Sequence, residues 1–323
     1  MRPLTIACLT LVAATLTAGV ASADPEGEGP VGHQVPSSFA ATEDYWTPER
    51  MAAAEPIEEP APESRPTPRQ AAAQGEQVDI APTPGPSDRR WIAPLPNNVT
   101  QQKTWNRGGA IARTAGKVFG IGGNGRDFVA SGNVVTSKDG DVVVTVAHAL
   151  INDDKQWSKN LVFVPAYKDG KAPYGKFAAR TMFIWSGYTD VQGNDSTLDF
   201  GMLVVKPVGG KQIQKVVGGQ GIRFNATPNG ARNVLLGYPS NGNAGKTLQY
   251  CTGPSVNPAY GMTYAIICDM GGGSSGGPWF QSFNSLTGSG YQISAHALRN
   301  STTSYGAFFG DQALKTFRAA EAA

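Results

Sequence analysis

From about residue 100 onward the chain is a succession of short apolar runs separated by turn residues, and this pattern constrains the fold most. The runs are rich in Val, Ile, Phe and Tyr and cover residues 127–136, 141–150, 161–167, 199–206, 233–239, 246–253, 262–269 and 291–298. Many short strands at turn-like spacing predict an all-β sandwich or barrel. Helical periodicity occurs only near the C-terminus, where 311–322 predicts one helix with Asp311 near its N-cap.

Residues 24–90 have a different composition, rich in Pro, Glu, Ala and Gly. Such a segment has too little apolar surface to offset its ordering entropy, so we expect it to be disordered, with polyproline-like stiffness in places. Before a folded domain at 91–323 it is most simply a propeptide, and a plain N-terminal linker is the alternative. The pair Arg89-Arg90 is a candidate processing site.

The first residues predict export. Arg2 precedes a mostly apolar stretch, and Ala21-Ser22-Ala23 fits a cleavage site, so 1–23 is predicted to be a signal peptide cut before Asp24. The alternative is a membrane anchor, but threonines and Gly19 interrupt the stretch. We therefore expect a secreted, extracellular protein with no stable membrane association.

Three cysteines occur, and Cys8 would leave with the signal peptide. The remaining pair, Cys251 and Cys268, predicts one disulfide in an exported protein. No Cys or His lies at ligand spacing beside them, so no metal site is expected. Charged residues make up 16% of the chain and the net charge is +2, which gives no argument for a nucleic-acid partner.

Three histidines limit the choice of a catalytic base: His33, His148 and His296. His33 lies in the predicted propeptide, whereas His148 ends an apolar strand. The sequence GGGSSGGP at 271–278 lets the backbone turn sharply and leaves amide groups free to face a ligand, as acyl transfer requires.

An acid must orient the base, and Asp199 opens the apolar run at 199–206, where a carboxylate can be held inside. Its rivals, Asp190 and Asp195, lie in a polar stretch and are expected to be solvated.

In the order His148, Asp199, Ser275 the chain resembles the chymotrypsin-fold serine peptidases. TVAHAL resembles their TAAHC motif, LDFGMLVV their DIALL motif, GGSSGGP their GDSGGP motif, and ASGNVVT the strand that precedes the histidine. The resemblance covers about 105–315. It implies two six-stranded antiparallel β-barrels, roughly 100–205 and 206–310, with the active site between them and a short C-terminal helix.

The resemblance also implies a secreted serine endopeptidase that acts on protein or peptide substrates as a monomer, without a cofactor. Ser275 would be the nucleophile, His148 the base and Asp199 its orienting acid, and the amides of Gly273 and Ser275 would form the oxyanion hole. An inactive binding module on the same fold and an esterase with the same triad are the alternatives.

A different hydrolase class is excluded by residue order. Gly273 to Gly277 also fits G-x-S-x-G, but α/β-hydrolases place the acid and then the histidine after the serine. Here His296 precedes Asp311, which is the reverse order.

Two departures concern activation and specificity. Ser274 stands where trypsin-like zymogens carry an aspartate, so that activation switch is expected to be absent; the bacterial glutamyl endopeptidases, which the chain also resembles, lack it too. Asp269 lies six positions before Ser275, as the acid that selects Arg or Lys does in trypsin, and a structural role for it is the alternative. His296 resembles the pocket histidine of glutamyl endopeptidases, where a protonated imidazole would favour Glu or Asp in a pH-dependent way. We expect a preference for Glu or Asp over Arg or Lys.

Overall fold

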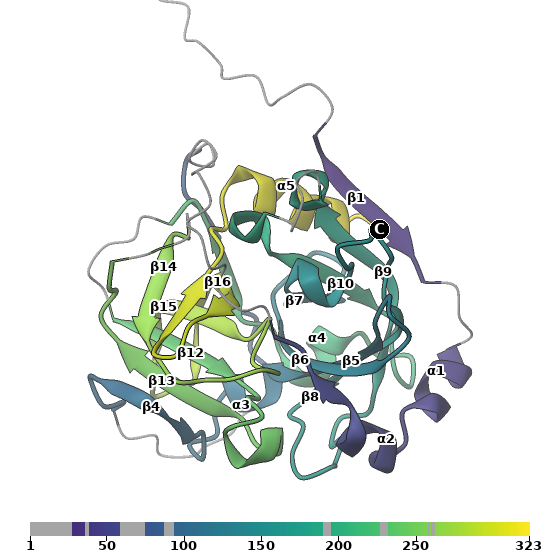
Figure 1. Cartoon of the computed structure of the whole chain (residues 1–323), viewed down its shortest axis with the longest axis horizontal. Helices are drawn as coiled ribbons and strands as arrows, with labels where there is room; N and C mark the ends of the chain where they lie inside the picture. Colours follow the sequence, from purple (N-terminus) through teal and green to yellow (C-terminus); the bar gives the residue numbers. More distant parts are fainter. Residues whose placement is uncertain are drawn as a thin grey trace, which may run out of the picture.

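Two β-sheets make up most of the computed structural model, which describes residues 28–35, 39–58, 75–86, 94–189, 195–226, 232–257, 259 and 262–323 (Figure 1). The predicted signal peptide, the Arg89-Arg90 pair and Asp190 lie outside the described residues.

A closed barrel of six strands forms the first unit. Its strands pair in the order β9-β10-β7-β6-β5-β8, and β8 pairs again with β9 to close the ring. All neighbours on this ring are antiparallel, as predicted. The strands are β5 (Ala115–Ile121), β6 (Asp127–Val134), β7 (Val142–Thr145), β8 (Lys159–Pro165), β9 (Phe177–Trp185) and β10 (Gly201–Val205).

The second sheet has nine strands and follows the order β14-β17-β16-β15-β12-β13-β4, with β11 along β16 and β3 along β11. Its strands are β3 (Val78–Ile80), β4 (Val99–Thr104), β11 (Gly221–Phe224), β12 (Asn233–Gly237), β13 (Gln249–Gly253), β14 (Tyr264–Ile267), β15 (Pro278–Asn284), β16 (Ser289–Arg299) and β17 (Thr303–Gly306).

Two pairings of the second sheet go beyond the simple pattern of two antiparallel barrels. Strand β4 pairs with β13 of the second sheet, although its residues were assigned to the first barrel. Strand β11 runs parallel to β16, although an antiparallel barrel was expected. Both are long-range pairings that the local pattern of apolar and turn residues does not specify.

Helices are few and short. They are α1 (Phe39–Tyr45), α2 (Pro48–Ala53), α3 (Ile111–Thr114), α4 (Ile213–Val217) and α5 (Asp311–Ala320), with 3₁₀ turns η1 (Ala147–Ala149), η2 (Ser186–Thr189), η3 (Ser196–Leu198) and η4 (Asn243–Gly245). The predicted C-terminal helix is α5, although Gly310 rather than Asp311 is its N-cap. None of the described helices has the length and apolar character needed to cross a membrane.

The N-terminal segment corrects the prediction of disorder for 24–90. In its described parts, β1 (Pro30–Gln34) pairs with β9, β2 (Glu55–Pro56) with β6, and β3 with β11. Trp46 is fully buried, Met51 is also buried, and the Trp46 indole donates to the carbonyl of Asn160 at 2.6 Å. The segment has too few apolar residues for a core of its own, but it adds them to a core that the barrels already provide.

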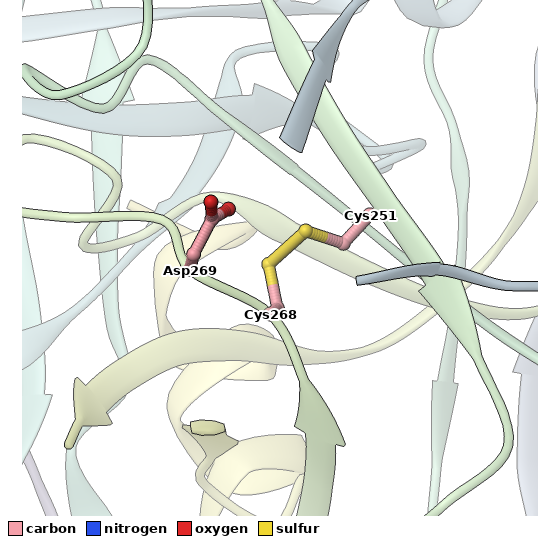
Figure 2. Close-up of side chains that lie close together, drawn as sticks. All are labelled: Cys251, Cys268 and Asp269. Carbon is pink, nitrogen blue, oxygen red and sulfur yellow. A yellow bond between two sulfur atoms is a disulfide. The ribbon is translucent and has the colours of Figure 1, made fainter. Parts of the chain in front are cut away.

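The predicted disulfide joins Cys251 on β13 to Cys268 just after β14 (Figure 2). Asp269 lies beside it, and one ligand atom from each of the three residues lies within 4.8 Å of the others. The two sulfurs are bonded to each other and are therefore not the thiolates that a metal ion would need. This cluster is a covalent link between two strands of the second sheet.

Replacing both cysteines with serine is expected to lower the free energy of unfolding by about 3 kcal/mol, because the link spans 17 residues of sequence and restricts the unfolded chain. Urea unfolding of the oxidised chain and of the double variant measures the difference. Equal midpoints for the two proteins would contradict the expectation.

Candidate active site

His148 and Asp199 come together because the strands beside them are neighbours. His148 lies in η1, just after β7, and Asp199 lies between η3 and β10; β7 and β10 pair with Thr145 opposite Gly201. Oδ2 of Asp199 lies 2.7 Å from Nδ1 of His148, and Oδ1 accepts a hydrogen bond from the His148 backbone N–H at 3.0 Å. The carboxylate thus holds both the backbone and the ring of the histidine.

Burial makes this pair well suited to hold a proton on Nδ1. The side chain of Asp199 is 1% exposed and that of His148 is 6% exposed. A carboxylate at Nδ1 favours the tautomer in which Nε2 can accept a proton, which is the state a general base requires. The rival Asp195 instead caps η3, where its carboxylate accepts from the backbone N–H and the hydroxyl of Thr197.

The loop that carries Ser275 is hydrogen-bonded to both sheets. The Ser275 carbonyl accepts from the backbone N–H of Ser131 on β6 at 2.7 Å, and the N–H of Gly276 donates to the carbonyl of His296 on β16 at 2.9 Å. Gly276 has φ +81°, and a Cβ there would lie 2.2 Å from the carbonyl oxygen of Ser131. Only glycine fits this approach, so the glycine-rich sequence serves the turn that the loop makes.

Of the three predicted catalytic residues, His148 and Asp199 are in direct contact in the structure. No hydrogen bond between Ser275 Oγ and the His148 ring is present among the described residues, and Ser275 is 5% exposed. Catalytic hydrogen bonds are often long before substrate is bound and shorten in the complex with substrate.

The backbone N–H of Gly273, which was predicted to form part of the oxyanion hole, donates a hydrogen bond to a carbonyl group. Gly273 has φ +88°, and its N–H donates to the carbonyl of Ile57, in the N-terminal segment, at 2.7 Å. A backbone N–H that donates to a carbonyl oxygen is the type of group that an oxyanion hole uses.

His296 is turned into the protein and is neutral. Ser274 Oγ donates to the carbonyl of Gly271 at 2.6 Å and lies 2.8 Å from Nδ1 of His296, from which its oxygen can then accept. Burial, with the positive charge of Arg299 and the nearby His148, lowers the pKa of His296 to about 3. The protonated pocket imidazole expected from the sequence is therefore wrong for this structure, because the side chain is 3% exposed and desolvated.

The lowered pKa of His296 predicts how stability changes with pH. The unfolded histidine takes up a proton near its ordinary pKa of 6.5, whereas the folded one does so only near 3, so stability is lost as pH falls through this window. The slope from this group is at most about 1.4 kcal/mol per pH unit. Urea unfolding between pH 3 and 7 should show a shallower slope for His296→Gln, and parallel curves for the two proteins would contradict the assignment.

Asp269 has a structural contact. Its Oδ1 accepts from the backbone N–H of Gln102 on β4 at 2.7 Å, and its own carbonyl accepts from the side-chain amide of Asn241. The carboxylate thus ties β4 to the segment after β14, which corresponds to the structural alternative given for this residue.

Arg299 and Glu58 form an ion pair at the site that was not predicted from the sequence. Nε of Arg299 lies 2.8 Å from Oε1 of Glu58. Arg299 is the single charged residue of β16, which was a signal in the sequence. Its partner could not be found that way, because Glu58 is distant in sequence and lies in a segment expected to be disordered.

Comparisons with known proteins agree with this architecture. The protease Anisep from Arthrobacter nicotinovorans is 33% identical, with a TM-score of 0.60 over 69% of this chain and 100% of that one. The thermostable serine protease AL20 from an extremophilic microorganism is 31% identical, with a TM-score of 0.59 over 66% of this chain and 99% of that one.

A Glu endopeptidase, solved in complex with MPD, shares the fold at 18% identity, with a TM-score of 0.54 over 71% of this chain and 98% of that one. No protein-family model matches the chain, and no curated protein matches it. The likeness to Anisep, over the whole length of that protease and on the same arrangement of strands, shows that the chain belongs to the chymotrypsin-fold serine peptidases.

Proposed function

We propose that the protein is a secreted serine endopeptidase that cleaves peptide bonds through an acyl-enzyme formed on Ser275. The observation that carries the proposal is the buried pair of His148 and Asp199, 2.7 Å apart. Such a pair on this fold supplies the base that a serine nucleophile needs.

In the proposed reaction, Ser275 Oγ attacks the carbonyl carbon of the substrate while its proton moves to Nε2 of His148. The negative charge that develops on the carbonyl oxygen is stabilised by the backbone N–H groups of Gly273 and Ser275. His148 then gives the proton to the leaving amine, the C–N bond breaks, and the acyl group stays on Ser275.

Deacylation repeats the sequence with water. His148 takes a proton from a water molecule, whose oxygen attacks the acyl carbon, and the proton returns to Ser275 Oγ as the acid product leaves. Asp199 remains ionised throughout and stabilises the imidazolium that forms in each half-reaction.

Export and processing belong to the same proposal. The disulfide between Cys251 and Cys268 supports an oxidising compartment. The contacts of residues 55–58 with the cleft support a role as a propeptide over one as a plain linker, since a linker has no need to touch Gly273 or Arg299.

Labelling with a fluorophosphonate probe tests the proposal. We expect one probe per chain, mapped to Ser275 by peptide mass spectrometry, and cleavage of a denatured protein substrate at internal bonds. Labelling at another serine would contradict the assigned nucleophile, and hydrolysis of small esters without peptide cleavage would favour the esterase alternative.

A further inference from the structure

Residues 54–58, here called the cleft segment, are bound to both sheets through their main chain. Glu55 and Pro56 pair in parallel with β6 of the first barrel, and the N–H of Ile57 donates to the carbonyl of Val129 at 2.9 Å. On the other side the N–H of Gly273 donates to the carbonyl of Ile57 at 2.7 Å. The segment therefore bridges the two units at the point where the proposed oxyanion hole lies.

The cleft segment also lies beside the catalytic histidine. A cavity of about 270 Å³ is lined by the residues from Glu55 to Glu58, by His148 and by the turn between β5 and β6. A substrate that reaches the His148 ring must share this space with the segment. In the uncut chain, the cleft segment thus competes with substrate for the active-site cleft.

A charged contact holds the end of the cleft segment. Oε1 of Glu58 lies 2.8 Å from Nε of Arg299, with the side chains 35% and 27% exposed. The carboxylate passes so close to the serine loop that a Cβ on Gly272 would lie 2.9 Å from its Oε2. Among the described residues Glu58 is the one acid paired with Arg299, and Nη1 of Arg299 donates a hydrogen bond to the carbonyl of Asn300.

The charge that could select an acidic substrate is carried by Arg299. His296, which the resemblance suggested for this role, is buried and neutral, and Asp269 accepts a hydrogen bond from β4. When the segment leaves, the Arg299 guanidinium loses the carboxylate of Glu58, and another carboxylate in the cleft can take that place. In a peptidase the anion available in the cleft is a carboxylate of the substrate.

We propose that Arg299 recognises an acidic side chain of the substrate and that Glu58 occupies its place in the uncut chain, keeping the enzyme latent. The inference rests on the proposed endopeptidase function and adds to it a substrate class and the means of its control.

Latency is tested on the full chain, with intact mass confirming that it is uncut. We expect the fluorophosphonate to label Glu58→Gln about five times faster than the unaltered chain, as loss of a partly exposed ion pair implies. Glu58→Arg should be faster still, because it places two positive charges together. The matched control is Glu55→Gln, in the same segment but paired only with Arg126 across 3.6 Å at the surface, and it should change the rate less than twofold.

A charge exchange separates this ion pair from general loosening of the segment. The double variant Glu58→Arg with Arg299→Glu restores the attraction with the signs reversed, so its labelling should return toward the slow rate. If Glu58→Gln and Glu55→Gln both label as the unaltered chain does, the latency is overturned.

Specificity is tested in the open Glu58→Gln background with peptides in which one Glu, or Gln of the same shape, is scanned through the positions around the cleaved bond. At one position kcat/KM should favour Glu about tenfold, and adding Arg299→Gln should bring the ratio close to one. An unchanged ratio would overturn the role of Arg299. Equal unfolding midpoints confirm that the variants are folded.

Failure of this inference is distinguishable from failure of the proposed function. If Ser275 is labelled but Glu58 and Arg299 variants behave as the unaltered chain does, only the inference is wrong. If no variant is labelled, the endopeptidase proposal is wrong, and fluorescence anisotropy with a dye-labelled Glu peptide still decides the recognition. Binding to Glu58→Gln that is lost on adding Arg299→Gln supports the site, and equal binding overturns it.

Discussion

Replacing Ser275 with alanine is expected to lower kcat for peptide hydrolysis by about 10⁶-fold while leaving the fold intact. The nucleophile and its base act as a unit. Removing the nucleophile alone therefore lowers kcat nearly as much as removing the whole triad. Among the described residues Ser275 is held through its backbone, and its Oγ makes no hydrogen bond that the fold would lose. Single-turnover assays with an activated peptide substrate measure the loss.

The neighbouring Ser274 is the matched control. Its hydroxyl is buried between Gly271 and His296, so Ser274→Ala should lower the free energy of unfolding by about 1–3 kcal/mol but still label with the fluorophosphonate. If Ser275→Ala retains labelling and Ser274→Ala loses it, the two serines have been assigned the wrong way round.

Replacing Asp199 with asparagine is expected to lower kcat by about 10⁴-fold, the second-largest effect. An asparagine amide can donate to Nδ1 where the carboxylate accepts, and it then favours the tautomer whose Nε2 cannot take the proton of Ser275. The loss should be smaller at alkaline pH, where other bases contribute. A pH–rate profile of kcat/KM for both proteins provides the measurement.

Asp195→Asn serves as the control for Asp199. Asp195 lies four residues before Asp199, caps η3 and accepts a hydrogen bond from the Thr197 N–H. Asp195→Asn should therefore lower the free energy of unfolding but change kcat little. A large loss of kcat in Asp195→Asn together with near-normal activity in Asp199→Asn would transfer the orienting role to the other aspartate.

The barrels and the aspartate–histidine pair were within reach of the sequence because their determinants are local. The apolar run at 141–150 is both a buried strand and the support for His148, and the run at 199–206 does the same for Asp199. The two strands pair with each other and bury these runs. His148 and Asp199, which flank the strands, are thereby brought into contact.

The placement of β4, the N-terminal strands and Arg299 could not be predicted in the same way. Composition predicted disorder for 24–90 because the segment is poor in apolar residues, but composition does not show which surfaces other parts of the chain provide. Trp46 shows the difference: in the sequence it stands with Tyr45 in an otherwise polar stretch, and in the fold it is fully buried. The prediction of a protonated His296 did not hold for a related reason. The strand motif gives the position of the residue, but not how far its side chain is exposed to water.

Strand β1 covers an edge of the first barrel that would be exposed if the N-terminal segment were removed. It pairs with the half of β9 from Thr181 to Trp185, whose other side is already bonded to β10. Removing the N-terminal segment uncovers the N–H and C=O groups of that half-strand as a free edge, to which another chain can add a strand. A chain without this segment is therefore expected to aggregate more readily than the uncut chain, because β1 covers that edge in the uncut chain.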